Sequence, residues 1–317
     1  RVSLNSIGRI FAIFAGIVTG ILLPLVRQSL GGWATTVIVL SILSAAMMIP
    51  MCLFAKERVI EREKARDGGA EENYTLRDMV ECLRSNKYLL IFFAAPLISS
   101  LLNIGATWGL YIARYCLGGE EIASFVSMAV IVPTLIGAAI AVQLCKKYDK
   151  FKIFYFSYMF ALILGIVRYI AGYENMMVYV ILNALGGFPL GIAAILQYQF
   201  TPDCYEYGQY KTGLKMRGVT FAAQTFFTKL NGAIATAVSV FALTLIGFKE
   251  GEGVIQAAGF ADKLWTFSCL GSIIGGIGTL LILRLYKLND HDVQLMSKCN
   301  NGEITREEAE AQMINRY

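Results

Sequence analysis

Apolar stretches long enough to cross a bilayer recur along almost the whole chain, and they constrain its fold more than any other feature. A spanning helix needs about 20 mostly apolar residues. Hydrophobic residues make up 56% of the chain and charged residues 16%, whereas a soluble domain is roughly a quarter charged. We therefore expect an all-α integral membrane protein. Its expected spans are residues 7–26, 33–54, 88–113, 122–144, 153–171, 176–200, 219–248 and 264–285.

Lysine and arginine are distributed unevenly over the connections between these spans. The connections on one side hold most of the basic residues, and such an excess marks the cytoplasmic side. We therefore expect a multi-pass cell-membrane protein with segments 55–86 and 203–217 and both ends of this chain in the cytoplasm. The opposite side holds only Arg27, Arg114, Arg168, Lys249 and Lys263.

The residues of soluble-type catalysis and metal binding are sparse. The seven cysteines are scattered without CxxC spacing, and His291 is the only histidine, which argues against a zinc site and against Ser-His-Asp or Cys-His chemistry. No carboxylate pair lies inside the spans. The formal charge of +5 follows from membrane topology and does not indicate nucleic acid. We expect neither an enzyme nor a resident metal or cofactor.

Lys229 lies near the middle of the apolar stretch 218–247. At about 1.5 Å per residue it is roughly 16 Å from Gly218, too deep to reach either surface comfortably. A charge at this depth marks transport chemistry by default. Gln224, Thr225 and Thr228 lie within about one turn of it. Threonine hydroxyls often bond only to their own helix, but we expect this group to line a cavity.

A second polar stripe is expected on span 88–113. Ser100, Asn103, Thr107 and Tyr111 recur at spacings of three and four, which places them on one helix face. Sugars need such donors and acceptors, with an aromatic face such as Trp108 or Tyr111 to pack against. Interhelical hydrogen bonding is the alternative explanation. Gln197 is a weaker candidate of the same kind.

Segment 203–217 is too charged to lie in lipid, so we expect it to be the loop that precedes the helix of Lys229. Segments 55–86 and 289–317 are also charged, and we expect a solvated linker and a solvated tail, with a short surface helix over 303–313.

These features together resemble the glycoside-pentoside-hexuronide:cation symporter family of the major facilitator superfamily. The family's loop before helix eleven has acidic residues, a Tyr-Gly pair, a Lys-Thr-Gly group and a basic residue, followed by a helix with a buried lysine. Gln209 and Arg217 depart from the pattern, each standing where the family has an acid. The matching residues are Asp203, Glu206-Tyr207-Gly208, Lys211-Thr212-Gly213, Lys215 and Lys229, with Arg9 at the start of helix five.

The resemblance implies a division of the chain. It places the eight spans as helices five to twelve of an expected twelve, with four helices before Arg1. Residues 1–54 would then end the first half, 55–86 would join the halves, 87–288 would form the second half, and 289–317 the cytoplasmic tail.

The resemblance also implies symport of a sugar or glycoside with Na⁺, H⁺ or Li⁺ by alternating access between the halves. The carboxylates that bind the cation are expected on helices outside this chain. Lipid and the two solutes are then the partners. The implied substrate-binding residues are Arg9, Asn103, Thr107, Trp108, Tyr111, Gln197, Gln224, Thr225, Thr228 and Lys229. The implied cytoplasmic gate, formed by charges that pair across the halves, comprises Asp203, Glu206, Lys211, Lys215 and Arg217.

Two other functions stay open. A lipid or lysolipid carrier of related fold would need an apolar groove open to the bilayer, whereas the polar stripe on span 88–113 favours a hydrophilic solute. A membrane sensor that does not transport is separated from a carrier by a transport assay.

Overall fold

The computed structural model describes residues 15–16, 33–54, 76–119, 121–215, 217–251 and 255–317. Apart from residues 15–16, the expected span 7–26 lies outside these residues, and so does Arg9. The same holds for residues 55–75 of the expected linker 55–86. In the part described, regular structure is helical throughout. Its membrane-length apolar helices are α7 (Glu121–Leu144), α8 (Lys150–Ala171), the continuous helical segment Met176–Thr212, α11 (Arg217–Leu245) and α12 (Phe260–Leu283). This confirms the expected all-α membrane fold.

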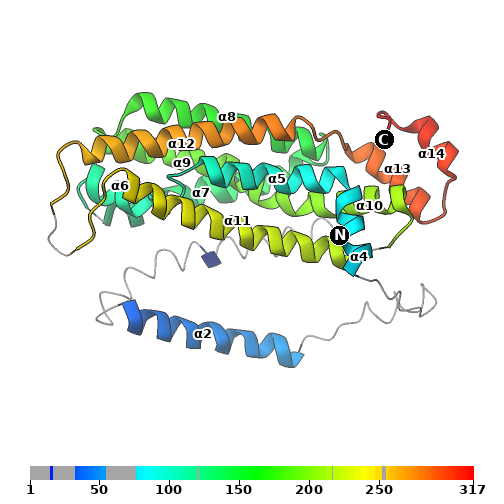
Figure 1. Cartoon of the computed structure of the whole chain (residues 1–317), viewed down its shortest axis with the longest axis horizontal. Coiled ribbons are helices and arrows are strands. Elements are labelled where there is room, and N and C mark those ends of the chain that lie inside the picture. Colours follow the sequence, from blue (N-terminus) through cyan, green and yellow to red (C-terminus); the bar gives the residue numbers. More distant parts are fainter. Residues whose placement is uncertain (1–14, 17–32, 55–75, 120, 216, 252–254) are drawn as a thin grey trace.

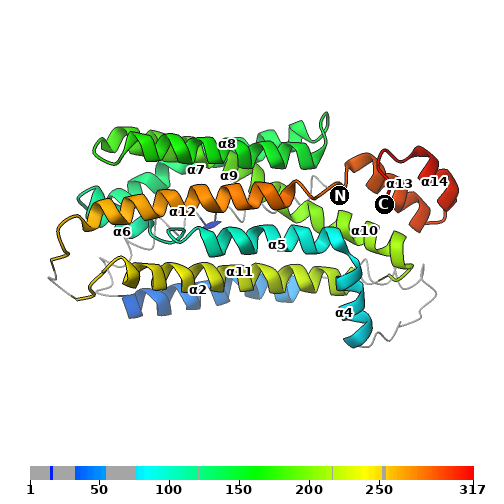
Figure 2. The ribbon, with the colours of Figure 1, turned by 45° about the horizontal axis from the view of Figure 1, so that its top comes forward.

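The helices after residue 86 form one bundle (Figures 1 and 2). α7 packs along α9 (Met176–Leu196), α8 packs against both α9 and α12, and α12 packs against α5 (Lys87–Leu102). α11 packs mainly against α5, at the edge of the bundle. α2 (Trp33–Phe54), which matches the expected span 33–54, lies apart from the bundle (Figure 1).

The expected span 88–113 is not one helix. α5 ends at Leu102, residues 103–108 form a turn, and α6 (Gly109–Cys116) follows. The turn lies directly on α12, since a Cβ atom at Gly105 would be 2.5 Å from the Ser268 Cα atom. Only glycine permits this approach. The prediction of one polar stripe was therefore wrong, because the helix breaks between Asn103 and Thr107.

Segment 203–217 is largely helix rather than loop. After α9 the chain passes through a 3₁₀ turn (Gln197–Gln199) into α10 (Phe200–Thr212), which ends at Gly213 with φ +74°. The loop prediction assumed that charge excludes regular structure at the membrane. Here the polar side chains contact protein instead, since Asp203, Tyr207 and Tyr210 are buried.

The tail is folded rather than solvated. α13 (Asp290–Asn300) packs against α10, and α14 (Arg306–Gln312) packs against α13. α14 lies within the expected helix 303–313 and begins with a capping box between Thr305 and Glu308. Met296 and Ala309 are fully buried, so apolar burial holds the tail on the bundle. In the expected linker, α4 (Leu76–Ser85) precedes α5.

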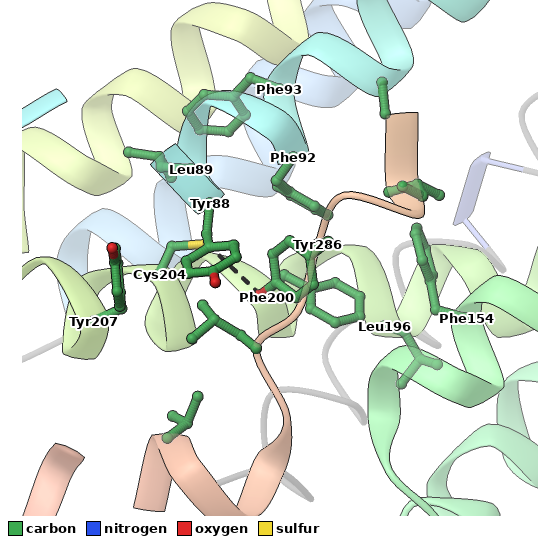
Figure 3. Close-up of a cluster of buried hydrophobic side chains, with 14 of the residues drawn as sticks. Tyr88, Leu89, Phe92, Phe93, Phe154, Leu196, Phe200, Cys204, Tyr207 and Tyr286 are labelled. Carbon is green, nitrogen blue, oxygen red and sulfur yellow. Dashed lines mark hydrogen bonds between the residues drawn. The ribbon is translucent and has the colours of Figure 1, made fainter. Parts of the chain in front are cut away.

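An aromatic cluster fixes α10 between the bundle and the tail (Figure 3). The Tyr88 ring lies edge-on to those of Tyr207 and Tyr286, with centroids 4.7 and 5.5 Å apart. Phe200 packs against Phe92 and Tyr286. Edge-to-face pairs of this kind each add about 0.5–1.5 kcal/mol beyond area burial. The cluster therefore determines where the polar residues of α10 lie.

Candidate functional site

The polar residues of α5 are bonded to its neighbours. Ser100 donates to the Asn231 Oδ1 atom of α11 at 2.5 Å, and Ser272 of α12 donates to the Asn103 Oδ1 atom at 3.1 Å. Both bonds link helices, so the interhelical explanation accounts for these two members of the expected stripe.

The aromatic candidates belong to the core of the bundle. Trp108 is fully buried, and its indole N–H donates to the Ser239 carbonyl at 3.0 Å. Tyr111 packs edge-on against Phe248. Trp108 therefore offers no face to a solute in this conformation. Thr107 is exposed in the turn before α6, and Gln197 begins the 3₁₀ turn, where it is partly buried.

The polar residues around Lys229 divide between two faces of α11. Gln224 is buried at 8% exposure, on the side of the helix that packs on the bundle. Lys229 and Thr225 are exposed on the opposite side. The hydroxyls of Thr225 and Thr228 donate to the carbonyls of Phe221 and Gln224 in their own helix. The four candidates therefore do not surround one point, and Lys229 has the uncovered face.

At the end of the bundle where α8 begins, three charged residues from α8, α10 and α13 meet. The Lys150 ammonium at the start of α8 lies 3.0 and 2.8 Å from the two Asp203 carboxylate oxygens and 3.1 Å from Asp290 Oδ1. The Lys150 and Asp203 side chains are only 17% and 13% exposed. The cluster borders a cavity of about 1020 Å³ between the α7–α8 connection and α13. An ion pair so removed from water depends on both partners.

The ends of α8 and α13 also cap each other. Asp149, the N-cap of α8, accepts from the Asp290 amide at 2.8 Å, and Asp290 accepts from the Lys150 amide at 2.9 Å. This exchange satisfies amide groups that a helix start leaves unpaired. Lys150 and Asp290 were not predicted as site residues, because basic residues between spans were interpreted only as a sign of topology. The available signal was the Asp-Lys pair that opens a helix.

The remaining gate candidates have local partners. Glu206 accepts a hydrogen bond from Asn300 of α13 at 2.9 Å. The Lys211 ammonium lies 3.4 Å from the Tyr207 hydroxyl. Lys215 and Arg217, at the α10–α11 junction, are exposed. Within the part of the chain described, Asp203 and Glu206 are bonded inside this bundle. Pairing across two halves stays a prediction.

Gly208 of the expected motif has a packing role. A Cβ atom at Gly208 would lie 2.8 Å from the Asn86 Nδ2 atom. Asn86 is buried there, donates to the Cys204 carbonyl at 2.6 Å and caps α5. Gly208 thus lets α10 approach the start of α5.

Asp292 fastens the chain's last residues to this assembly. Its buried carboxylate accepts from the amides of Ile314 and Asn315 at 2.8 and 3.1 Å and from the Tyr317 hydroxyl at 2.8 Å. Burial alone would raise the pKa of Asp292, but these bonds lower it below its ordinary value. The ionised form therefore stabilises the docked tail.

We expect Asp292→Asn to release residues 314–317, because the amide has one acceptor oxygen and no charge. Bonds to charged groups contribute about 1.5–3 kcal/mol each, so hydrogen exchange at the Ile314 and Asn315 amides should accelerate at least tenfold. The depressed pKa means that the carboxylate's contribution is complete above about pH 4 and is lost as pH falls through the folded pKa. Exposed Glu307→Gln is the control. Unchanged protection in Asp292→Asn would contradict this role.

The comparisons with known proteins agree on one family. The sequence pattern of the family described as MFS/sugar transport protein matches residues 1–290. The uncharacterized symporter YnaJ of Bacillus subtilis is 25% identical over 81% of this chain and 56% of its own length. YagG of Escherichia coli, provisionally assigned as a glycoside/cation symporter, is 23% identical over 89% of this chain and 61% of itself. The chain thus spans roughly three fifths of these relatives.

Proposed function

Because this chain belongs to the MFS/sugar transport family, we propose that it forms part of a secondary active transporter for a sugar or glycoside and a coupling cation. Membership makes it a multi-pass membrane transport protein rather than an enzyme. In the proposed mechanism, solutes bind near the bilayer midplane between two helical halves, which rock to expose the site to each side in turn.

The uncovered face of α11 carries this proposal. Thr225, Lys229, Gly232 and Thr236 follow one another at spacings of four, three and four, and all are exposed. A Cβ atom at Gly232 would meet open space. An unpaired ammonium facing lipid at this depth is strongly unfavourable. We infer that this face lines a water-filled cavity between the halves, where Lys229 binds an oxygen of the solute.

The relatives suggest the solute class. One is provisionally assigned as a glycoside/cation symporter, and another from Escherichia coli as a sulfoquinovose importer. We propose that this chain recognises a hydroxyl-rich sugar or glycoside, because Lys229 can donate to hydroxyl, carboxylate or sulfonate oxygens. Na⁺ or H⁺ is the proposed coupling ion. We also propose that Asn103 and Gln224 contact the solute and that the five gate residues close the cytoplasmic side.

A counterflow screen tests the function. The full-length protein, reconstituted in vesicles loaded with neutral or acidic sugars, should exchange at least one labelled sugar, and its uphill uptake should require a Na⁺ or H⁺ gradient. Exchange of a lysolipid but no sugar would favour the lipid carrier. No exchange of any solute by folded protein would favour a sensor.

The topology gives a separate prediction. We place the α10–α11 junction in the cytoplasm and the α11–α12 connection outside, since basic residues are concentrated near the former. In a background without native cysteines, Lys249→Cys should react with an impermeant maleimide added to intact cells, and Lys215→Cys only after lysis. Both positions are exposed. Labelling of Lys215→Cys in intact cells would overturn the orientation.

A further inference from the structure

A cavity of about 460 Å³ lies among α7, α8, α9 and Asn103 at the end of α5, with an arginine at one end. Its α8 wall includes Ala161, Gly165 and Arg168, and its α9 wall includes Asn183, Gly186 and Leu190. α8 and α9 are consecutive and adjacent helices, so they run in opposite directions. From Arg168 the groove therefore passes Gly165 and Ala161 on one wall and Gly186 and Leu190 on the other.

Arg168 lacks an adequate partner. One guanidinium nitrogen, Nη1, donates to the Asn183 Oδ1 atom at 3.3 Å, and the guanidinium also interacts with the Cys269 thiol of α12, while the Nε atom is buried without a hydrogen-bond partner. Among the residues that the structure describes, no carboxylate forms an ion pair with Arg168. A guanidinium has five donors and remains charged, and a charge sheltered from water is costly without an anion. An anionic ligand would therefore stabilise Arg168 in this site.

The groove opens at the outer surface of the bundle. Leu190 on its α9 wall is 57% exposed, and Ala161 on its α8 wall is also exposed. Both residues belong to membrane-length apolar segments, so we expect this opening to contact lipid tails. Arg168 follows Lys150 by 18 residues in α8, or about 27 Å along the axis. The hydrocarbon layer is about 30 Å thick. With Lys150 at one boundary, Arg168 lies at the depth of the opposite headgroups.

Gly165 and Gly186 leave the groove open. A Cβ atom at Gly186 would meet no other protein atom within 4 Å, and one at Gly165 would come only within 3.9 Å of Ile273. Neither glycine is thus required for helix packing. Their missing side chains leave a channel that leads from Arg168 toward the middle of the bilayer. Its lining beyond Arg168 and Asn183 is mostly apolar, with Ser157 and Asn103 as the polar exceptions.

We propose that this groove binds an anionic phospholipid, with the phosphate group on Arg168 and an acyl chain between α8 and α9. The guanidinium fork matches phosphate oxygens in geometry and charge. A free anion would use the arginine but not the channel, whereas a neutral lipid would leave the guanidinium charge unmatched. One amphiphile meets both requirements.

Thermal unfolding of delipidated full-length protein tests the assignment. Phosphatidylglycerol should raise the melting temperature at lower concentration than phosphatidylcholine does. Arg168→Gln should weaken the apparent affinity for phosphatidylglycerol at least tenfold and remove the preference over phosphatidylcholine. Gly186→Leu, or Gly165→Leu should the first variant not fold, should weaken binding of both lipids by filling the channel. Exposed Lys263→Gln on the α12 side is the control and should resemble the parent protein.

Several outcomes would overturn the proposal. Equal responses of the parent and Arg168→Gln to phosphatidylglycerol would remove Arg168 from the site, and an unchanged response in both glycine variants would remove the groove. Stabilisation by soluble glycerol phosphate to the same extent would assign the site to a free anion. Mass spectrometry of co-purified lipid provides a second readout, because Arg168→Gln should retain less phosphatidylglycerol.

Discussion

Lys229→Ala in the full-length protein is expected to abolish uphill accumulation of the transported sugar. Lys229 is the cationic group on the uncovered face of a membrane-length helix, and we infer that it links the solute to the coupling ion. Losing a charge-assisted contact of about 1.5–3 kcal/mol weakens solute binding roughly 10- to 150-fold. Uptake against a gradient, measured in cells with the sugar found by counterflow, should fall to the level of cells lacking the protein.

Two controls make this result specific. Thr244→Ala changes an exposed residue near the far end of the same helix, whose hydroxyl already bonds to the Phe241 carbonyl, so uptake should stay within about twofold of the parent. Lys249→Ala removes an exposed positive charge beyond the end of α11 and should also be tolerated. Membrane insertion of Lys229→Ala should be preserved, because removing a charge from the middle of an apolar span favours insertion. Normal uphill uptake by Lys229→Ala would assign Lys229 a structural role.

The spans could be predicted where lipid alone determines structure. Helix ends of α2, α7, α8 and α12 fall within about four residues of the expected bounds, since a bilayer requires helices of about this length and composition. This requirement acts on each segment separately, so the sequence of a segment is sufficient to identify it as a membrane span.

Prediction failed where one segment's structure depends on another. The break after Leu102 arises from close contact of Gly105 with α12, and α10 is helical because α8 and α13 provide partners for its charges. The tail is folded because Asp292 binds it. Each of these contacts joins residues distant in sequence, so a local sequence pattern does not predict it.

The candidate site shows the same division. Lys229 was found from sequence because a charge within an apolar span is conspicuous. Trp108 was assigned to the sugar from its chemistry, yet its indole is bonded to Ser239 inside the core. Gly208 and Gly213 of the motif have a packing contact and a left-handed helix cap respectively. A motif that serves packing and one that serves transport look alike in a single sequence.

The two partners of the ion pair between α8 and α10 are expected to differ in how much stability their replacement costs. Lys150→Met should destabilise the protein by about 3–5 kcal/mol, since it leaves the buried Asp203 carboxylate without a cation. Asp203→Asn should cost less, because Lys150 keeps Asp290 at 3.1 Å. The double variant with Lys150→Met and Asp203→Leu should recover most of the lost stability, since apolar replacement of a buried pair is often neutral. Thermal unfolding of the purified full-length variants measures this order, and equal losses in both single variants would contradict it.

Transport by the same double variant then distinguishes a gate from a structural bond. A structural pair needs only to hold α8, α10 and α13 together, so a stable double variant should transport like the parent. A gate must break and re-form when this end of the carrier opens and closes, and its replacement by a permanent apolar contact removes the charges that favour the closed state. We expect the second result, in which the double variant is stable but its uphill uptake falls at least tenfold, because Asp203 and Lys150 border the cavity of about 1020 Å³ at this end of the bundle. Uptake at the parent's rate would assign the pair to folding alone.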